Sequence, residues 1–424
     1  MKTFNENKLD SNIIKAIDEL GFDKPTQIQQ KAIPIAMKGK DLLGTAQSGS
    51  GKTAAFLLPI LNNLAQTRIE VPVLRALIIA PTRELAKQIS QAVDDLGKYL
   101  DIKNTTIFGG VSLKDQEKKI ANGLDIVVAT TGRLMEHLRN NTIDLSSITH
   151  VVIDEVDTIL AMGFLEDLEA ILPNVGPNRQ IMMFSATLNQ NVKKLAKEFL
   201  NDPAVVEVVN QRSSVDIIEQ RVIEVDPNQK APLLSYLIGS QNYPQVLVFV
   251  NTKKIADALV RHFELDGLPS ACIHGDVRQS ARAKALRKFK EGEIRVLVAT
   301  DIAARGIDIE MLPVVVNFEL PETIADYTHR IGRTGRAGNP GTAITLLSVK
   351  DYRMMMDIEK ELILDLGRQT VEDFEPTEKK PRLVKPKPKK LSEKKAGNRE
   401  KVAKRGPKKS KKTTKRDEGR SFRR

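Results

Sequence analysis

Short apolar runs alternate with longer stretches of helical periodicity along most of the chain. Residues 84–100 and 188–200 place apolar side chains on one helical face, as amphipathic helices do. Runs that are apolar on both faces and alternate with helices are typical of a parallel sheet covered on both sides. The pattern therefore predicts an α/β fold. In the N-terminal half, the predicted strands cover residues 75–81, 105–108, 125–130, 150–154 and 180–187.

The same alternation begins again in the second half of the chain. A polar break at residues 205–220 separates the two halves and predicts a linker. We therefore expect two similar α/β domains, at residues 1–209 and 215–366, joined by a linker at 210–214. Such domains bind ligands beyond the carboxyl ends of their strands. The apolar runs of the second half cover residues 245–252, 270–276, 294–301, 314–320 and 341–348.

Charge is distributed unevenly between the body of the chain and its end. The net charge is +12, but residues 379–424 hold 22 Lys and Arg against 4 acids, which leaves the remainder at −6. With few apolar residues, the segment 367–424 is predicted to be a disordered, Lys/Arg-rich tail. Dense positive charge favours contact with phosphate backbones of any sequence. A purely solubilising role is the alternative.

The cysteine content and the apolar segments indicate the cellular compartment of the protein. Cys272 is the single cysteine, so a disulfide framework is excluded. The N-terminus has no apolar signal region, and no run of about 18 apolar residues is present. These features predict a cytoplasmic protein that makes no membrane contact.

Residues 46–53, AQSGSGKT, have the composition of a phosphate-binding loop before a helix. Glycines let backbone N–H groups turn towards a phosphate at the helix N-terminus. Lys52 would reach the outer phosphates, and the Thr53 hydroxyl would ligate Mg²⁺. The first position of the usual pattern is alanine instead of glycine. The predicted nucleotide contacts are Ala46, Gln47, Ser48, Gly49, Ser50, Gly51, Lys52 and Thr53.

An acidic cluster, Asp154, Glu155 and Asp157, follows the apolar run that ends at residue 153. Two adjacent carboxylates at a strand end are common in nucleotide hydrolases, where they hold Mg²⁺ and direct a water. They are also common as ordinary solvated strand ends. Because a phosphate loop precedes this cluster, the sequence favours an ATPase that uses ATP and Mg²⁺.

The second half contains no phosphate loop, since the run 245–252 passes into the next helix without a glycine. It does contain HRIGRTGR at 329–336, in which Arg330, Arg333 and Arg336 recur every third residue. Guanidinium groups directed at a γ-phosphate stabilise phosphoryl transfer, and supplying them from a second domain makes hydrolysis depend on closure. An exposed basic loop is the alternative.

In these motifs and their order, residues 4 to about 350 resemble the DEAD-box ATP-dependent RNA helicases. The resemblance rests on FDKPTQIQ at 22–29, the loop at 46–53, PTRELA at 81–86, Gly109–Gly110, TTGR at 130–133, DEVD at 154–157, SAT at 185–187, HGDVRQSAR at 274–282, VATDIAARGIDI at 298–309 and HRIGRTGR. It implies two RecA-like parallel-sheet domains in tandem. It also implies ATP hydrolysis that is stimulated by RNA and coupled to local duplex unwinding.

The resemblance also implies a role for individual residues. It assigns adenine recognition to Phe22 and Gln29, ribose contact to Asp308, and the arginine fingers to Arg333 and Arg336. Asp154 would hold Mg²⁺ and Glu155 would deprotonate the attacking water. Coupling between ATP and RNA is implied for Asp157, Ser185, Thr187 and His329, and RNA-backbone contact for Pro81, Arg83, Gly110, Arg133 and Thr300.

Two residues depart from the family pattern. Val156 replaces an expected alanine and Thr131 an expected proline. The larger valine is expected to displace Asp157 if its pocket cannot adjust, at a cost of roughly 1–3 kcal/mol. ATP hydrolysis should survive either change, whereas coupling to RNA is the property at risk.

Two other functions fit the same sequence. The protein could be an ATP-dependent RNA clamp or assembly platform, or an RNA chaperone that acts through its tail. Backbone contacts do not identify the RNA, so ribosomal precursors and the substrates of RNA-decay machinery are equally compatible.

Overall fold

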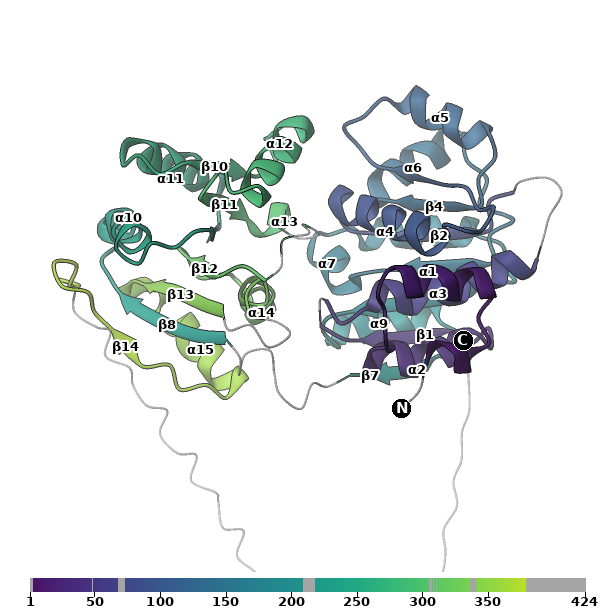
Figure 1. Cartoon of the computed structure of the whole chain (residues 1–424), viewed down its shortest axis with the longest axis horizontal. Coiled ribbons are helices and arrows are strands. Elements are labelled where there is room, and N and C mark those ends of the chain that lie inside the picture. Colours follow the sequence, from purple (N-terminus) through teal and green to yellow (C-terminus); the bar gives the residue numbers. More distant parts are fainter. Residues whose placement is uncertain are drawn as a thin grey trace, which may run out of the picture. The chain divides into compact units, whose positions relative to one another are not determined.

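The computed structural model describes residues 3–47, 49–67, 73–208, 218–304, 307, 309, 311–335 and 341–378. The linker expected at 210–214 and the basic segment 379–424 lie outside this part of the chain. Within it, the strands form two seven-stranded sheets, each of which is parallel throughout (Figure 1). The predicted α/β fold with two tandem parallel-sheet domains is confirmed.

The first sheet has the strand order β3-β4-β2-β5-β6-β1-β7. Its central strands are buried on both faces, which explains their continuous apolar sequences. The strands are β1 (Leu42–Thr45), β2 (Ala76–Ile79), β3 (Asn104–Ile107), β4 (Ile126–Ala129), β5 (His150–Ile153), β6 (Gln180–Ser185) and β7 (Ala204–Glu207).

Helices cover both faces of the first sheet and form two separate apolar cores. Alternate strand residues point to opposite faces, so Ile78 joins one core and Leu77 the other. Residues of α1 (Ser11–Glu19), α2 (Gln27–Ala36), α3 (Lys52–Gln66) and α4 (Arg83–Leu96) contribute to the first core. The remaining helices are α5 (Leu113–Ala121), α6 (Thr131–Arg139), α7 (Val156–Ala161), α8 (Leu165–Ile171) and α9 (Gln190–Phe199), with 3-10 turns η1 (Phe4–Asn7) and η2 (Leu172–Asn174).

The second sheet repeats this arrangement with the order β10-β11-β9-β12-β13-β8-β14. Its strands are β8 (Ile218–Glu224), β9 (Val246–Val250), β10 (Ser270–Ile273), β11 (Val296–Thr300), β12 (Val314–Asn317), β13 (Gly341–Leu347) and β14 (Arg368–Gln369). Its helices are α10 (Lys230–Ser240), α11 (Lys253–Leu265), α12 (Gln279–Lys290), α13 (Asp301–Ala304), α14 (Ile324–Ile331) and α15 (Tyr352–Leu362), with 3-10 turns η4 (Pro227–Gln229) and η5 (Val349–Asp351).

The polar break predicted at residues 205–220 is shorter than expected. Strand β7 occupies one end of it and strand β8 the other, and the parts of both strands that lie in this segment include exposed or half-buried side chains. Their mixed polarity explains why the apolar pattern missed them. The first strand of the second domain is therefore β8 instead of the run at 245–252. The turn after β8, residues 225–229, also lacks a glycine.

The second domain continues beyond the boundary predicted at residue 366. Residues 368–378, which we call the C-terminal strap, begin with β14 paired to β8. Phe374 then packs with its ring centroid 5.7 Å from that of Tyr236. The Asp226 carboxylate accepts hydrogen bonds from the Thr377 amide at 2.9 Å and from the Thr377 hydroxyl at 2.6 Å. Hydrogen bonding to Thr377 lowers the pKa of Asp226. The C-terminal strap has few apolar residues, among them Val371 and Phe374, so the apolar pattern of the sequence did not predict it.

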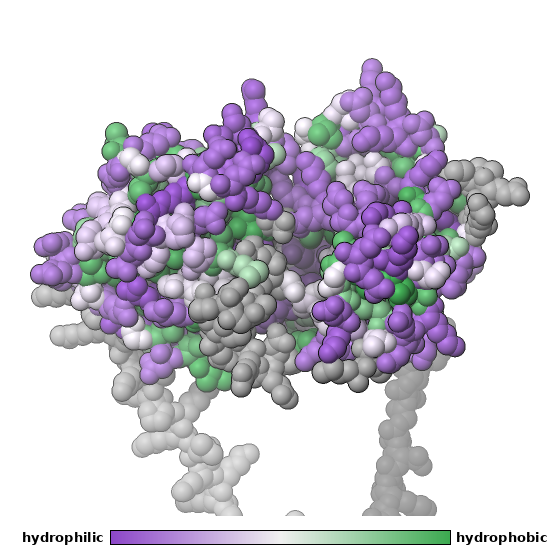
Figure 2. All heavy atoms as spheres, in the orientation of Figure 1, coloured by the Kyte–Doolittle hydropathy of each residue, from purple (hydrophilic) through white to green (hydrophobic). Residues whose placement is uncertain are grey.

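The visible surface in Figure 2 is mainly hydrophilic, with apolar side chains scattered among polar ones. Among the described residues, no helix is both long and apolar enough to cross a membrane.

Candidate nucleotide and RNA site

The phosphate loop connects the end of β1 at Thr45 to the start of α3 at Lys52. Gly49 and Gly51 have φ angles of 70° and 90°, in the left-handed region that glycine adopts without strain. The buried Lys52 ammonium donates to the Ala46 carbonyl oxygen at 2.8 Å, which holds the lysine over the loop. Ser48 lies outside the described residues.

Gln29 from α2 supports this loop directly. Its side-chain amide donates to the Gly51 carbonyl oxygen at 3.0 Å, and its carbonyl accepts from the Thr26 amide at 2.8 Å. A Cβ atom added to Gly51 would lie 2.4 Å from Gln29 Nε2, so glycine is needed here for space as well as conformation. One of the two N–H groups of the Gln29 amide is thus committed to the loop. Phe22, with 41% of its surface exposed, has a ring available for stacking.

The acidic cluster follows β5 at the same edge of the sheet. Asp154 is buried, and its carboxylate accepts from the Glu155 amide at 2.9 Å. Glu155 has a left-handed φ of 49° and begins α7. Burial raises the pKa of Asp154 to about 7, with Lys52 opposing the shift and Glu155 adding to it.

A divalent cation suits this environment. A buried carboxylate whose charged form is disfavoured gains from a positive ion, and Asp154 and Thr53 both offer hard oxygen ligands. These residues therefore fit Mg²⁺.

Asp157 links the acidic cluster to residues 185–187 at the end of β6. Its carboxylate accepts from the Thr187 amide at 3.0 Å and from the Thr187 hydroxyl at 2.9 Å. Ser185 donates to the Thr187 carbonyl oxygen at 2.7 Å. The contact that the family resemblance implied between DEVD and SAT is thus present.

Three predicted RNA-backbone motifs of the first domain meet around residues 109–111. Gly110 has a φ of 85°, and an added Cβ would lie 2.4 Å from Arg83 Nη1, so the Arg83 guanidinium packs over this loop. Arg133 donates to the Val111 carbonyl oxygen at 3.1 Å. Desolvation lowers the pKa of Arg83, and the nearby Arg133 adds to that shift. Pro81 precedes Thr82, whose hydroxyl caps α4.

In the second domain, the described residues give only part of the predicted site. Thr300 ends β11, and His329 lies on α14. Arg333 follows α14, is 9% exposed, and donates to the Ile307 carbonyl oxygen at 3.0 Å. Asp308 and Arg336 lie outside the described residues.

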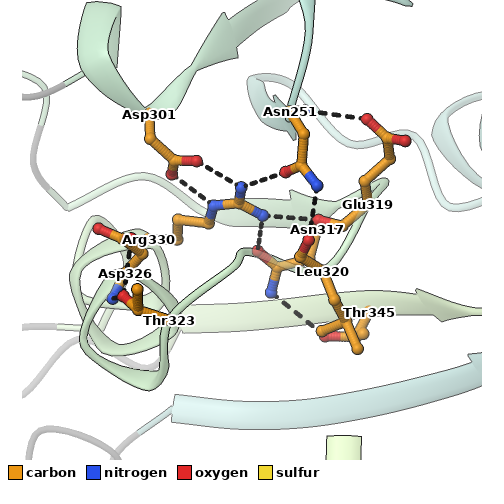
Figure 3. Close-up of polar contacts among 9 residues, drawn as sticks. All are labelled: Asn251, Asp301, Asn317, Glu319, Leu320, Thr323, Asp326, Arg330 and Thr345. Carbon is orange, nitrogen blue, oxygen red and sulfur yellow. Dashed lines mark hydrogen bonds and ion pairs between the residues drawn. The ribbon is translucent and has the colours of Figure 1, made fainter. Parts of the chain in front are cut away.

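Arg330 is buried more deeply than Arg333, the other described arginine of its motif. It is 1% exposed and donates to both Asp301 carboxylate oxygens at 2.6 Å (Figure 3). Its remaining donors reach Asn251 at 2.9 Å and the Glu319 carbonyl oxygen at 2.6 Å. With its donors occupied in this way, Arg330 joins the ends of β9, β11 and β12. The expectation that all three arginines face a phosphate is wrong for Arg330, because spacing alone does not show which of them the helix turns inward.

Comparison with known proteins agrees with this geometry. Residues 26–195 match the DEAD/DEAH box helicase family, and residues 229–338 match the helicase conserved C-terminal domain. The DEAD-box ATP-dependent RNA helicase CshA of Geobacillus kaustophilus is 40% identical over 85% of this chain and 76% of its own length. The corresponding Bacillus subtilis protein is 41% identical over 84% and 72%. The chain belongs to the DEAD-box ATP-dependent RNA helicases.

The solved structures support the same assignment. S. cerevisiae Dbp5 bound to RNA and ADP BeF3 superposes with a TM-score of 0.79 at 30% identity, over 88% of this chain and 97% of that one. As a DEAD-box helicase, this protein is an ATP-hydrolysing enzyme that acts on RNA, which confirms the predicted class of function.

Val156, the residue that departs from the DEAD tetrad, is fully buried in the second apolar core of the first domain. Asp157 nevertheless keeps both contacts to Thr187. The condition under which Val156 was expected to displace Asp157 is therefore not met, because the core accommodates the valine. Thr131, the other departure, is buried as the first residue of α6.

Replacing Val156 with alanine should lower stability instead of relieving strain. Removing two buried methyl groups leaves a cavity and is expected to cost about 1–3 kcal/mol in the free energy of unfolding. RNA-stimulated ATP turnover should remain unchanged. Denaturant unfolding and steady-state ATPase assays measure both properties, with the exposed Val205→Ala as the control. A stabilised variant with faster turnover would show that the valine strains the site.

Arg330→Ala should unfold the second domain at much lower denaturant concentration. It leaves the Asp301 carboxylate without its guanidinium partner, and removing one member of a buried pair costs about 3–5 kcal/mol. The measurement is unfolding without ATP or RNA, compared with the exposed Arg353→Ala on α15. Loss of ATPase activity with unchanged stability would instead assign Arg330 to the substrate.

Proposed function

We propose that ATP binds across the phosphate loop and the acidic cluster, and that its hydrolysis is coupled to the local parting of RNA duplexes. The arrangement of Lys52, Asp154 and Glu155 at one edge of the first sheet carries this proposal. Family membership supplies the reaction class, and the resemblance of the motifs implies the residue roles, which the contacts of the described residues support.

In the proposed mechanism, each residue acts on a defined part of the nucleotide. Lys52 exchanges its contact with the Ala46 carbonyl for the outer phosphates and stabilises their charge. Glu155 accepts the proton of the attacking water. Mg²⁺, held by Thr53 and Asp154, would neutralise charge on the β- and γ-phosphates. Phe22 would stack on adenine, while Gln29 keeps the loop in its binding conformation and has a second N–H for the base.

The second domain would complete the site. We infer that Arg333 and Arg336 meet the γ-phosphate and that Asp308 contacts the ribose. Arg330 plays a positioning role, since it fixes α14, which precedes Arg333, against the strand ends. Charge completion by a second domain would make hydrolysis conditional on domain closure.

The proposed RNA site includes Arg83, Gly110 and Arg133 in the first domain and Thr300 in the second. Packing of Arg83 and Arg133 around residues 109–111 supports it, since guanidiniums bind phosphate oxygens well. Such contacts position a strand without identifying its bases. The Asp157–Thr187 bonds offer a route by which the state of the nucleotide affects residues 185–187, with His329 as a further member of this link. A cytoplasmic location is part of the proposal.

Glu155→Gln should abolish ATP turnover while ATP and RNA binding persist. The amide keeps the shape of the side chain but cannot accept the proton. Phosphate release measured with saturating RNA should fall by about 100-fold or more. Glu169→Gln, at an exposed position on α8, is the matched control. Normal turnover in Glu155→Gln would refute the assignment of the base.

Truncation after Glu378 separates the helicase from a tail-driven chaperone. This variant retains the C-terminal strap and removes the segment with 22 basic residues. A helicase should keep RNA-stimulated hydrolysis and duplex displacement but bind RNA more weakly, with a shallower dependence on salt. Loss of strand displacement with the tail, while hydrolysis continues, would favour the chaperone. If the full-length protein also hydrolyses ATP and binds RNA stably but displaces no strand, the result would favour the clamp.

A further inference from the structure

Asp257, Cys272 and His274 bring three different metal-ligating groups together in the second domain, and none of them is among the proposed nucleotide contacts. Cys272 and His274 are two residues apart at the end of β10, so their side chains leave the strand on the same face. Helix α11 packs against β10 and supplies Asp257. The ligating atoms of all three side chains lie within 4.8 Å of one another.

The separations between these atoms are close to those within a zinc coordination sphere, with the nitrogen–oxygen pair about 0.3 Å shorter. His274 Nε2 lies 3.0 Å from Asp257 Oδ1, and Cys272 Sγ lies 3.5 Å from the same oxygen. Zn–S bonds of about 2.3 Å and Zn–N or Zn–O bonds of about 2.0–2.2 Å in a tetrahedron separate the ligand atoms by about 3.3–3.6 Å. Small side-chain shifts would therefore suffice to admit the ion.

The surroundings provide both a fixed ligand and an entry path. His274 is buried, and its Nδ1 has no hydrogen-bond partner among the described residues. The Asp257 side chain is 45% exposed, so an ion can enter from its side and keep a water as the fourth ligand. The set of one thiolate, one imidazole and one carboxylate favours zinc over harder cations such as Mg²⁺.

We propose that Asp257, Cys272 and His274 form a Zn²⁺ site that joins α11 to the end of β10. Burial and the Asp257 carboxylate raise the pKa of the Cys272 thiol to about 11, so this thiol is protonated and unreactive at neutral pH in the absence of metal. Zinc would bind the thiolate, displace this proton to solvent and accept the lone pair of His274 Nε2. A bound ion would stabilise the strand end that leads into residues 274–282.

Cobalt provides the direct test, because Co²⁺ occupies zinc sites and its spectrum reports the ligands. The full-length, tag-free protein is stripped of metal with a chelator and titrated with CoCl₂, followed by competition with ZnCl₂. We expect one equivalent to bind, with a thiolate-to-cobalt charge-transfer band and visible bands of tetrahedral intensity. Zinc should displace the cobalt and raise the melting temperature.

Variants then identify the ligands. Cys272→Ser should abolish the charge-transfer band, and Asp257→Asn and His274→Ala should each weaken binding about tenfold or more. His262→Ala is the matched control, since His262 on the same helix pairs with Asp266 at 3.3 Å and is not among the three grouped ligands. Circular dichroism of each metal-free variant checks its fold. The proposal fails if wild-type protein gives no charge-transfer band at excess cobalt, or if the band and the zinc-induced stabilisation survive in Cys272→Ser.

Discussion

The first domain depends on the parallel pairing of its central strands. Because β1, β6, β5 and β2 run in the same direction and in register, their carboxyl ends lie at one edge of the sheet. Thr45 pairs with Ser185, and Ile153 pairs with both Met183 and Ile79. The four loops that leave these strands therefore start side by side, although they are far apart in the sequence. The phosphate loop, the acidic cluster and residues 185–187 are brought together by this register alone. Any shift of one residue between strands would turn their side chains to the opposite face.

Local hydrogen bonds then position the side chains that the strand register brings together. Lys52 is held by the Ala46 carbonyl and Gly51 by Gln29, so contacts within the protein position these two residues of the loop. Asp154 is buried near Lys52, and this burial raises the pKa of Asp154. Preorganised charge of this kind stabilises a reacting phosphate without reorganisation during the reaction. The buried Asp154 carboxylate, whose charged form is disfavoured, is thus one of the groups at which we propose that a cation binds.

Sequence patterns predicted most of the fold, because buried parallel strands are continuously apolar. They missed β1, which is a four-residue strand that includes a glycine and a threonine. They also missed β7, β8 and β14, whose mixed polarity reflects positions at or near sheet edges. They also grouped Arg330 with Arg333. The two differ because α14 ends at Ile331, so that Arg330 belongs to its last turn and points inward while Arg333 follows it. Such distinctions depend on tertiary contacts that spacing does not encode.

The two sheets explain why we propose a phosphate site in the first domain and not in the described part of the second. Strand β8 lies between β13 and β14 as β1 lies between β6 and β7, so the turn after β8 corresponds to the phosphate loop. That turn has no glycine, and its Asp226 carboxylate is hydrogen-bonded by Thr377 of the C-terminal strap. A carboxylate just before a helix occupies the place that suits an anion. The Asp226 carboxylate of the second domain therefore lies where a phosphate would otherwise bind, which agrees with the proposal that this domain contributes arginines and not a phosphate loop of its own.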